Sequence, residues 1–281
     1  MAEPAPAPAP ARRSRPQRLA RVVCTEQVTP HMIRIVFGGE GLQGFGAGEF
    51  SDHYVKLQVP PLGADYVAPF DAEDIKARLP REHWPRTRTY TVRAWDPERT
   101  ELTIDFVVHG DEGVAGPWAA NAQPGDALQL SGPGGAYAPD PDAAWHLMVG
   151  DPSVIPAISA SLARIPAGVE VHVLIEVEGP DDEQPLATPG ELHLRWVHGG
   201  PGAVVPVLEE HAFPEGAVHA FVHGEAGTVR AVRRHLLVDR AIPREALSVS
   251  GYWKQTRTEE GWREDKAEWN RLVEEDVAAT G

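Results

Sequence analysis

The spacing of turn-forming residues changes at Pro139-Asp140-Pro141, and this change constrains the fold more strongly than any other feature of the chain. Before it, short strand-like runs are separated by glycine and proline, and residues 102–108 show the period-two pattern of a strand. After it, strand-like and helix-like runs alternate. The first pattern predicts a closed antiparallel barrel, and the second predicts a parallel sheet covered by helices on both faces.

These patterns divide the chain into an extended, disordered Ala/Pro tail at 1–16, a barrel at 17–140, and an α/β domain with a C-terminal helix at 141–281. In the barrel we expect strands at 19–27, 32–37, 54–59, 88–94, 101–109 and 127–130, and an insertion with a short helix at 61–85. In the second domain we expect strands at 145–149, 169–177, 192–197, 218–223 and 246–250, and helices at 153–164, 204–211, 228–239 and 258–277.

Composition narrows the possible partners and compartments. The formal net charge of −15 disfavours binding to nucleic acid and to anionic membranes. No stretch approaches the roughly 18 apolar residues of a membrane span, and no secretory signal is present, so we expect a cytoplasmic protein. We also expect a monomer. The single cysteine, Cys24, excludes an intramolecular disulfide, and we expect it to be a small core residue. The 12 histidines are scattered, and no metal site is predicted.

The segment Arg88-Thr89-Tyr90-Thr91 has the composition of a strand, so Arg88, Tyr90 and Val92 should share one face. Such a face suits a flavin, because a guanidinium can bind a diphosphate and a phenol ring can lie on the isoalloxazine. A neighbouring threonine hydroxyl can reach a ring nitrogen of the flavin. The alternative is an exposed polar strand.

Two further patterns suit a bound nucleotide. Residues 109–119 form a glycine-rich turn that opens a short helix, where backbone N–H groups can meet a phosphate. In the second domain, glycine follows nearly every expected strand, at 150, 179, 199–200, 224 and 251. Ligands of parallel sheets bind beyond the carboxyl ends of the strands, so these glycines favour a ligand there. Ordinary turn chemistry is the alternative for each glycine taken singly.

In order, the chain shows the flavin-type strand, the glycine-rich helix start and a nucleotide-type parallel domain, as in ferredoxin–NADP reductases. More specifically, the chain resembles the siderophore-interacting protein family over nearly its whole length from residue 17. The segments that carry this resemblance are 54–57, 88–93, 105–110, 113–119, 150–151, 181–184, 223–226, 250–254 and 257–262.

The resemblance implies an FAD-dependent ferric-siderophore reductase that receives electrons from NADH, NADPH or ferredoxin. By motif position, the residues implied to hold FAD are Arg88, Tyr90, Thr91, His109, Gly113, Val114, Ala115 and Trp118, with Trp253 or Tyr252 over the flavin ring. The residues implied to border the nicotinamide donor are Gly150, Asp151, Gly224, Glu225 and Tyr252. Lys56, Lys254 and Arg257 are candidates to attract the anionic chelate, and their alternative is solvated surface charge. Outer-sphere electron transfer needs no general base, so no catalytic residue is assigned.

The sequence departs from the family pattern at the mouth of the implied site. Gly132-Pro133-Gly134-Gly135 stands where many members carry an arginine, and Pro152 replaces a glutamate. Two other functions therefore stay open: a flavin reductase of the same architecture that serves a ferredoxin or monooxygenase, and a non-catalytic siderophore-binding protein.

Overall fold

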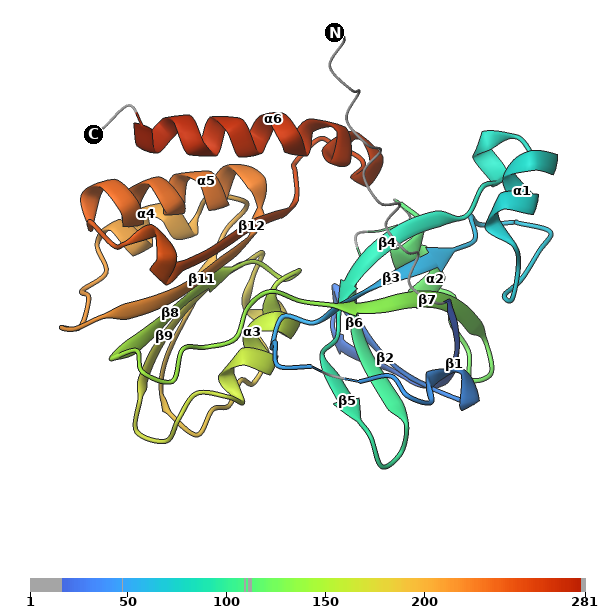
Figure 1. Ribbon diagram of the computed structural model, residues 1–281, viewed down its shortest axis with the longest axis horizontal. Helices are drawn as coiled ribbons and strands as arrows, with labels where there is room; N and C mark the ends of the chain where they lie inside the picture. The colour runs from blue at the N-terminus through green and yellow to red at the C-terminus, as the bar shows by residue number, and fades with distance from the viewer. Residues whose placement is uncertain (1–16, 47, 109, 111–112, 279–281) are drawn as a thin grey trace, which may run out of the picture.

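The computed structural model describes residues 17–46, 48–108, 110 and 113–278. The tail predicted at 1–16 and the predicted site residue His109 lie outside the described residues. The described chain contains a seven-stranded sheet and a five-stranded sheet, which lie side by side in Figure 1. In the described part of the chain, no helix combines the length and the apolar character needed to cross a membrane.

The first sheet is antiparallel and follows the order β4-β3-β7-β1-β2-β6-β5. Its inward side chains form one apolar core that includes Ile35, Phe37 and Phe106. The strands are β1 (Arg18–Thr29), β2 (Met32–Gly38), β3 (Tyr54–Val59), β4 (Arg86–Thr91), β5 (Ala94–Asp96), β6 (Glu101–Val107) and β7 (Ala127–Gly134). The short helices are η1 (Glu40–Leu42), α1 (Ala72–Arg78), η2 (Arg81–His83) and α2 (Ala115–Asn121). The short helix expected in the insertion at 61–85 is α1.

The strand predicted at 88–94 is wrong as a single element. β4 ends at Thr91 and β5 begins at Ala94, and these two strands stand at opposite ends of the sheet order. Between them the chain bends: Val92 N–H donates to His53 O at 2.7 Å, and Arg93 N–H donates to Thr103 O at 2.9 Å. One straight strand could not reach both β3 and β6. The bend therefore carries the chain from its pairing with β3 to its pairing with β6, at the other end of the sheet.

The expectation that Cys24 is a core residue is also wrong, because this thiol is exposed. The pairing of β1 with β2 shifts register between Val22 and Cys24. A β-bulge of this kind breaks the alternation of inward and outward side chains. Val22 is buried, and residues 23–27 after it are exposed.

The second sheet is parallel and follows the order β10-β9-β8-β11-β12. Its strands are β8 (Trp145–Gly150), β9 (Glu170–Val177), β10 (Glu191–His198), β11 (Val218–Glu225) and β12 (Leu247–Trp253). The helices are α3 (Ile155–Leu162), η3 (Pro180–Asp182), α4 (Val204–Glu209), α5 (Ala226–Arg234), the π-helix η4 (His235–Asp239), η5 (Arg244–Ala246) and α6 (Glu259–Ala278). In Figure 1, α3 covers one face of the sheet, and α4, α5 and α6 lie on the other. The predicted fold class is confirmed.

Residues 262, 269 and 273 are spaced seven and four apart, so they share one face of α6, and that face packs on the second domain. Trp262, Trp269 and Val273 are buried in the same core as Val222 and Val229. The Trp269 indole donates to Ala226 O at 3.0 Å. A Cβ on Gly251 would stand 2.8 Å from the Trp262 ring, so glycine at this position lets α6 approach β12.

Candidate functional site

Arg88 and Tyr90 lie on one face of β4, as predicted. In the antiparallel register, Arg88 stands opposite Leu57 and Tyr90 stands opposite Val55, and both partners are buried. The Tyr90 ring lies 4.5 Å from the Phe106 ring, centroid to centroid. This face of the strand therefore turns toward the barrel core, and one side of the Tyr90 ring is already packed.

Thr91 lies on the opposite face of β4 and connects the barrel to the parallel sheet. Its side chain is buried and lies beside the side chain of Tyr252, the next-to-last residue of β12. Burial raises the pKa of the Tyr252 phenol, so it stays protonated. A residue predicted to hold the flavin thus touches a residue predicted to border the electron donor.

Asp151 joins the carboxyl ends of three neighbouring strands. Its buried carboxylate accepts the N–H of Glu225 at 2.7 Å and the indole N–H of Trp253 at 2.8 Å. The other carboxylate oxygen accepts the N–H of Ser153 at 2.9 Å and its hydroxyl at 2.5 Å. Burial raises the pKa of Asp151, and these four donors act against that shift. Asp151 therefore fixes the orientation of the Trp253 ring.

The glycines at two strand ends make room for side chains of this chain. A Cβ on Gly224 would stand 2.4 Å from the Asp151 carboxylate, and Gly224 has a φ of 128°, which disfavours other residues. A Cβ on Gly150 would stand 2.7 Å from Val154. Close packing around Asp151 explains both glycines without a ligand.

Carboxylates of the chain occupy the helix starts beyond these strands. Glu225 accepts the N–H groups of Gly227 and Thr228, at 2.6 and 2.9 Å, and so caps α5. Glu176 accepts the N–H groups of Gly202 and Val204, at 3.0 and 3.2 Å, before α4. Burial raises the pKa of Glu176 to about 7. Sequence reasoning missed Glu176, although an acidic residue inside the apolar run 169–177 was a signal.

The glycine-rich turn leads into α2, as predicted. Gly113 has a φ of 77°, and Val114 occupies the N-cap of α2 without a side-chain hydrogen bond. Ala115 is buried against the barrel core. Trp118 stacks on Phe37, with ring centroids 6.2 Å apart and planes at 13°. The Trp118 ring therefore forms part of the barrel wall.

Arg88 is paired with the first turn of α6. Its Nη1 lies 2.6 Å from Glu260 Oε1, and its Nε lies 3.2 Å from Glu259 Oε2. The arginine side chain is 14% exposed, whereas those of Glu259 and Glu260 are 24% and 33% exposed. In Figure 1, the first turn of α6 is directed toward β4, which agrees with these contacts. The cation predicted to grip a diphosphate thus has two carboxylates in contact with it.

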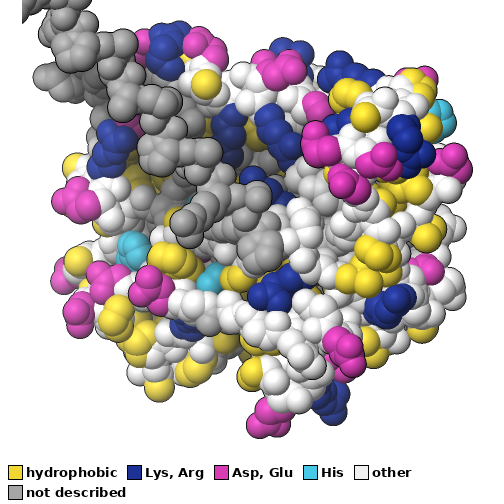
Figure 2. All heavy atoms as spheres, turned by 45° about the vertical axis from the view of Figure 1, so that its right-hand side comes forward, with side chains coloured by type: hydrophobic (Ala, Val, Ile, Leu, Met, Phe, Trp, Pro, Cys, Tyr) yellow, Lys and Arg dark blue, Asp and Glu magenta, His cyan; other side chains and the backbone are white. Residues whose placement is uncertain are grey.

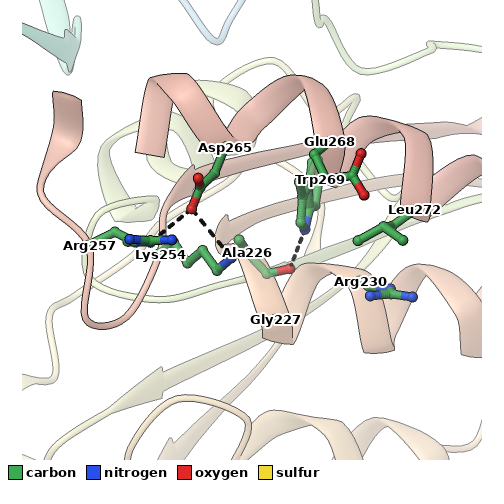
Figure 3. Close-up of a pocket in the computed structure, with 9 residues that line it drawn as sticks. All are labelled: Ala226, Gly227, Arg230, Lys254, Arg257, Asp265, Glu268, Trp269 and Leu272. Atoms are coloured by element: carbon green, nitrogen blue, oxygen red, sulfur yellow. Dashed lines mark hydrogen bonds and ion pairs between the residues drawn. The ribbon is translucent and has the colours of Figure 1, made fainter. Parts of the chain in front are cut away.

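Lys254 and Arg257 line a groove of about 350 Å³ between α5 and α6, shown in Figure 3. Asp265 pairs with Arg257 at 2.8 Å and with Lys254 at 3.7 Å. Apolar atoms of Trp269 and Leu272 line the same groove, and Arg230 lies at its rim. The structure therefore brings together two of the three predicted chelate residues.

Lys56 does not line that groove. It is exposed on β3, opposite Thr89, on the face of the ladder that carries Thr91 and not Arg88. Lysine and arginine side chains border a hollow on the face shown in Figure 2, although the net charge of the chain is −15. Positively charged side chains are thus clustered on this face, although the chain as a whole is acidic.

The comparisons with known proteins identify the family. Residues 21–137 match the siderophore-interacting FAD-binding domain, and residues 143–256 match the siderophore-interacting protein domain. The chain therefore belongs to the siderophore-interacting protein family, with an FAD-binding antiparallel domain followed by a ferredoxin–NADP reductase-like α/β domain.

Several relatives carry reductase names. The chain is 36% identical to the ferric vibriobactin reductase ViuB of Vibrio cholerae, over 89% of this chain and 93% of that protein. It is 32% identical to the NADPH-dependent ferric-chelate reductase of Escherichia coli, over 83% of this chain and 91% of that protein. An uncharacterized protein of Mycobacterium tuberculosis is 42% identical, over 95% of this chain and 99% of that protein.

A solved structure agrees with the fold. The siderophore-interacting protein SipS of Aeromonas hydrophila superimposes with a TM-score of 0.77 at 30% identity. The match covers 92% of this chain and 99% of that chain. Both sheets and their connection are therefore shared with a member of the family.

Proposed function

We propose that this protein is an FAD-dependent ferric-siderophore reductase, which releases iron as Fe(II) with electrons from NAD(P)H or a ferredoxin. The observation that carries the proposal is the contact of Arg88, on the flavin-type strand β4, with Glu259 and Glu260 of α6, the helix that follows β12. Thr91 of the same strand lies beside Tyr252 at the carboxyl end of β12. The reductase names of the relatives from Vibrio cholerae and Escherichia coli support the same activity.

The residues at this junction fit a bound FAD. Arg88 is a largely buried cation whose ion-pair partners, Glu259 and Glu260, are partly exposed, so a phosphate group can replace them. Nearby, Nδ1 of buried His223 lacks a hydrogen-bond partner among the described residues. The His223 ring lies 5.1 Å from the Tyr252 ring. A polar ligand at the junction would satisfy this nitrogen.

Each residue has a distinct role in this proposal. Arg88, Tyr90 and Thr91 hold FAD, with Gly113, Val114 and Ala115 at its phosphates and Trp118 near its adenosine. Tyr252 and Trp253 cover the ring, and Asp151 holds the Trp253 indole in place through their 2.8 Å hydrogen bond. FAD, when bound, accepts an electron pair and delivers electrons singly, which one-electron reduction of Fe(III) requires.

The chelate and the donor approach from the exposed side of the junction. Lys254 and Arg257, and Lys56 on β3, attract the anionic chelate, while Gly150, Asp151, Gly224, Glu225 and Tyr252 border the donor. Reduction to Fe(II) weakens the hold of hard oxygen ligands on the iron, so the metal is released. Because Glu176 and Glu225 occupy the helix-start amides, the diphosphate of a dinucleotide donor must bind elsewhere along this edge. We further propose that the protein is cytoplasmic and monomeric.

The deciding experiment is stopped-flow spectroscopy of the purified chain loaded with FAD. NADH, NADPH and reduced ferredoxin are each mixed with the flavoprotein, and a ferric chelate is then added. Bleaching of the flavin by one donor, followed by its reoxidation as Fe(II) appears, supports the proposal. A chain that binds the ferric chelate but no flavin would instead be a siderophore-binding protein.

One structural observation favours a second function, a flavin reductase that exchanges electrons with a ferredoxin. The capped helix starts disfavour a dinucleotide, and the sequence lacks the family's arginine near Gly134. This function predicts fast exchange with reduced ferredoxin and no faster reoxidation when ferric chelate is added.

A further inference from the structure

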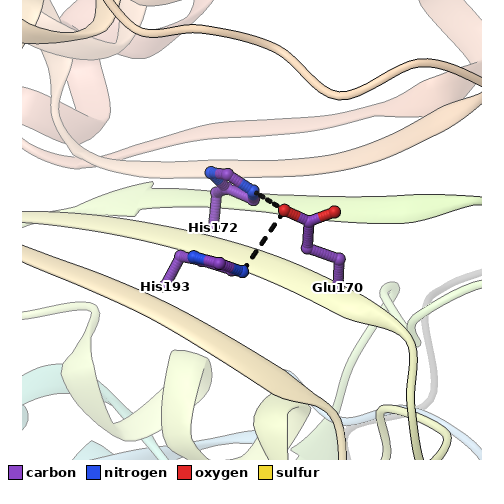
Figure 4. A group of neighbouring side chains, drawn as sticks. All are labelled: Glu170, His172 and His193. Atoms are coloured by element: carbon purple, nitrogen blue, oxygen red, sulfur yellow. Dashed lines mark hydrogen bonds and ion pairs between the residues drawn. The ribbon is translucent and has the colours of Figure 1, made fainter.

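Three side chains of metal-binding type lie together at the amino ends of β9 and β10. This is the edge of the parallel sheet opposite the carboxyl ends described above. Glu170 and His172 stand at the start of β9, and His193 stands near the start of β10, as Figure 4 shows. His172 Nε2 lies 2.7 Å and His193 Nε2 lies 3.2 Å from the same carboxylate oxygen of Glu170. All three ligand atoms lie within 4.8 Å of one another.

The fold itself produces this grouping. Glu170 and His172 are two residues apart on a strand, so their side chains leave the same face of the sheet. β9 and β10 are parallel, and His193 stands directly opposite His172 in their register. The backbone ladder thus holds two of the ligands on one strand and the third on its neighbour.

The cluster has a closed side and an open side. The His172 side chain is 9% exposed, and its ring packs edge-on against the Trp145 ring at 5.5 Å. The side chains of Glu170 and His193 are 35% and 52% exposed. One ligand is therefore anchored in the core, and two ligands face solvent and can move.

We propose that Glu170, His172 and His193 form a binding site for a divalent transition-metal ion, with Zn²⁺ as the best match. Two imidazole nitrogens and one carboxylate oxygen are a donor set that Zn²⁺ accepts, and the solvent-exposed side leaves its fourth position for water. No part of the proposed reductase reaction uses these residues.

Binding requires a small rearrangement. With bonds of about 2.0–2.2 Å to a tetrahedral ion, the ligand atoms must lie roughly 3.3 Å apart. Glu170 therefore moves away from His172, because their atoms are now 2.7 Å apart. The His193 ring, stacked on His172 at 4.6 Å and 17°, turns so that its Nε2 lone pair faces the ion. Both moving side chains are the exposed ones.

His211 positions His172 through the ring nitrogen that does not face Glu170. Its Nε2 lies 2.7 Å from Nδ1 of His172, on the side away from Glu170. When His211 Nε2 accepts the Nδ1–H of His172 across this 2.7 Å contact, the Nε2 lone pair of His172 is left free for the ion.

The test is titration of the metal-free, full-length protein with Zn²⁺ in a calorimeter. Glu170→Gln and His193→Ala change exposed side chains, and each should weaken one Zn²⁺ binding event by more than about tenfold. His198→Ala is the matched control: His198 is also on β10, is 46% exposed and pairs with Glu183. It should bind Zn²⁺ as the parent does. Equal affinity in the parent and in Glu170→Gln and His193→Ala would overturn the proposal, as would a parent that binds no Zn²⁺.

A second measurement tests the positioning role of His211. Co²⁺ replaces Zn²⁺, and its visible absorption reports the ligand geometry. His211→Ala should weaken Co²⁺ binding by about 10–100-fold and shift the absorption band. His211→Gln, whose amide oxygen can still accept from His172, should recover part of both. An unshifted band in His211→Ala would show that His211 does not orient His172.

Discussion

The two sides of the domain junction satisfy their charges in different ways. On the barrel side, the Arg88 guanidinium is paired with Glu259 and Glu260, which come from a distant helix and are partly exposed. At the carboxyl edge of the parallel sheet, Asp151 and Glu225 are buried and bound to backbone N–H groups.

This difference has a consequence for ligand binding. A phosphate can replace the partly exposed carboxylates on Arg88, because it offers the guanidinium the same kind of charge-assisted hydrogen bonds. Replacing a buried carboxylate would leave several donors unpaired, at about 1–3 kcal/mol each. The barrel side is therefore the place for an exchangeable anion, and the carboxyl edge is a fixed scaffold.

The largest loss of stability is expected for substitutions in α6, the helix that carries Glu259 and Glu260. Trp262 is 3% exposed, and replacing it with alanine should destabilise the protein by about 3–5 kcal/mol in urea unfolding. For the same reason, truncation after Gly251 should unfold the second domain rather than merely expose the flavin. Val67→Ala, at a side chain that is 80% exposed, is the control and should change stability by less than about 0.5 kcal/mol. A small loss in Trp262→Ala would mean that the Arg88 ion pairs hold α6 in place.

Asp151→Ala should produce the next largest loss, about 3 kcal/mol of unfolding free energy. The substitution leaves the buried Glu225 N–H and the Trp253 indole without an acceptor. Asp181→Asn, at an exposed residue of η3, is the control and should be nearly neutral. If Asp151→Ala is as stable as the parent but no longer oxidises NAD(P)H, then Asp151 contacts the donor and the scaffold role is refuted.

Arg88→Ala should lower FAD affinity by about 1.5–3 kcal/mol, or roughly tenfold to a hundredfold, because a charge-assisted contact to phosphate is lost. Fluorescence titration of the apoprotein with FAD measures this change. Arg99→Ala, which removes an arginine that is 73% exposed with ion pairs of only 4.0 Å, should leave the affinity unchanged. Unchanged affinity in Arg88→Ala would remove Arg88 from the proposed flavin site.

Glu260→Gln should have a smaller effect of the opposite sign. If Glu260 competes with the flavin phosphate for Arg88, its neutral analogue should bind FAD about two- to fivefold more tightly. The same titration distinguishes the outcomes. Weaker FAD binding would show that Glu260 holds α6 in a position that the flavin needs.

The two-domain architecture could be predicted from the sequence, because it depends on the local periodicity of apolar residues. The period-two runs and the glycine and proline between them gave nearly correct bounds for most strands, and β3 agrees at both ends. The helix expected at 258–277 corresponds to α6, but the surface that it covers does not follow from the sequence, because amphipathic spacing carries no information about the partner. Cys24 was misplaced for a related reason: a register shift depends on the pairing strand.

The candidate site at the domain junction could be predicted only in part. Family motifs placed Arg88, Thr91 and Tyr252, and the structure brings Thr91 and Tyr252 into contact. The four donors of Asp151 could not be inferred, because two of them come from residues 74 and 102 positions away. Capping by Glu176 was hidden for the same reason, since its amide partners follow a different strand.

Glu176 gives an effect that appears only as a dependence on pH. Its pKa is raised from 4.5 to about 7 by burial, so the folded state holds the proton more tightly than the unfolded chain does. The stability from this group is therefore present below about pH 4.5 and is lost as the pH rises through about 7. Glu176→Gln stays neutral and can still accept from Gly202 or Val204. Its stability relative to the parent should rise between about pH 5 and pH 8 in urea unfolding.

The control for this measurement is Glu209→Gln, at an exposed glutamate near the end of α4. Its stability relative to the parent should not change with pH in this way. If the difference in unfolding free energy between Glu176→Gln and the parent is also independent of pH, then Glu176 is ionised in the folded protein at every pH tested. A charged Glu176 would still occupy the amides before α4 and would repel a donor phosphate more strongly. The contrast between an exchangeable barrel side and a fixed carboxyl edge would then be sharper.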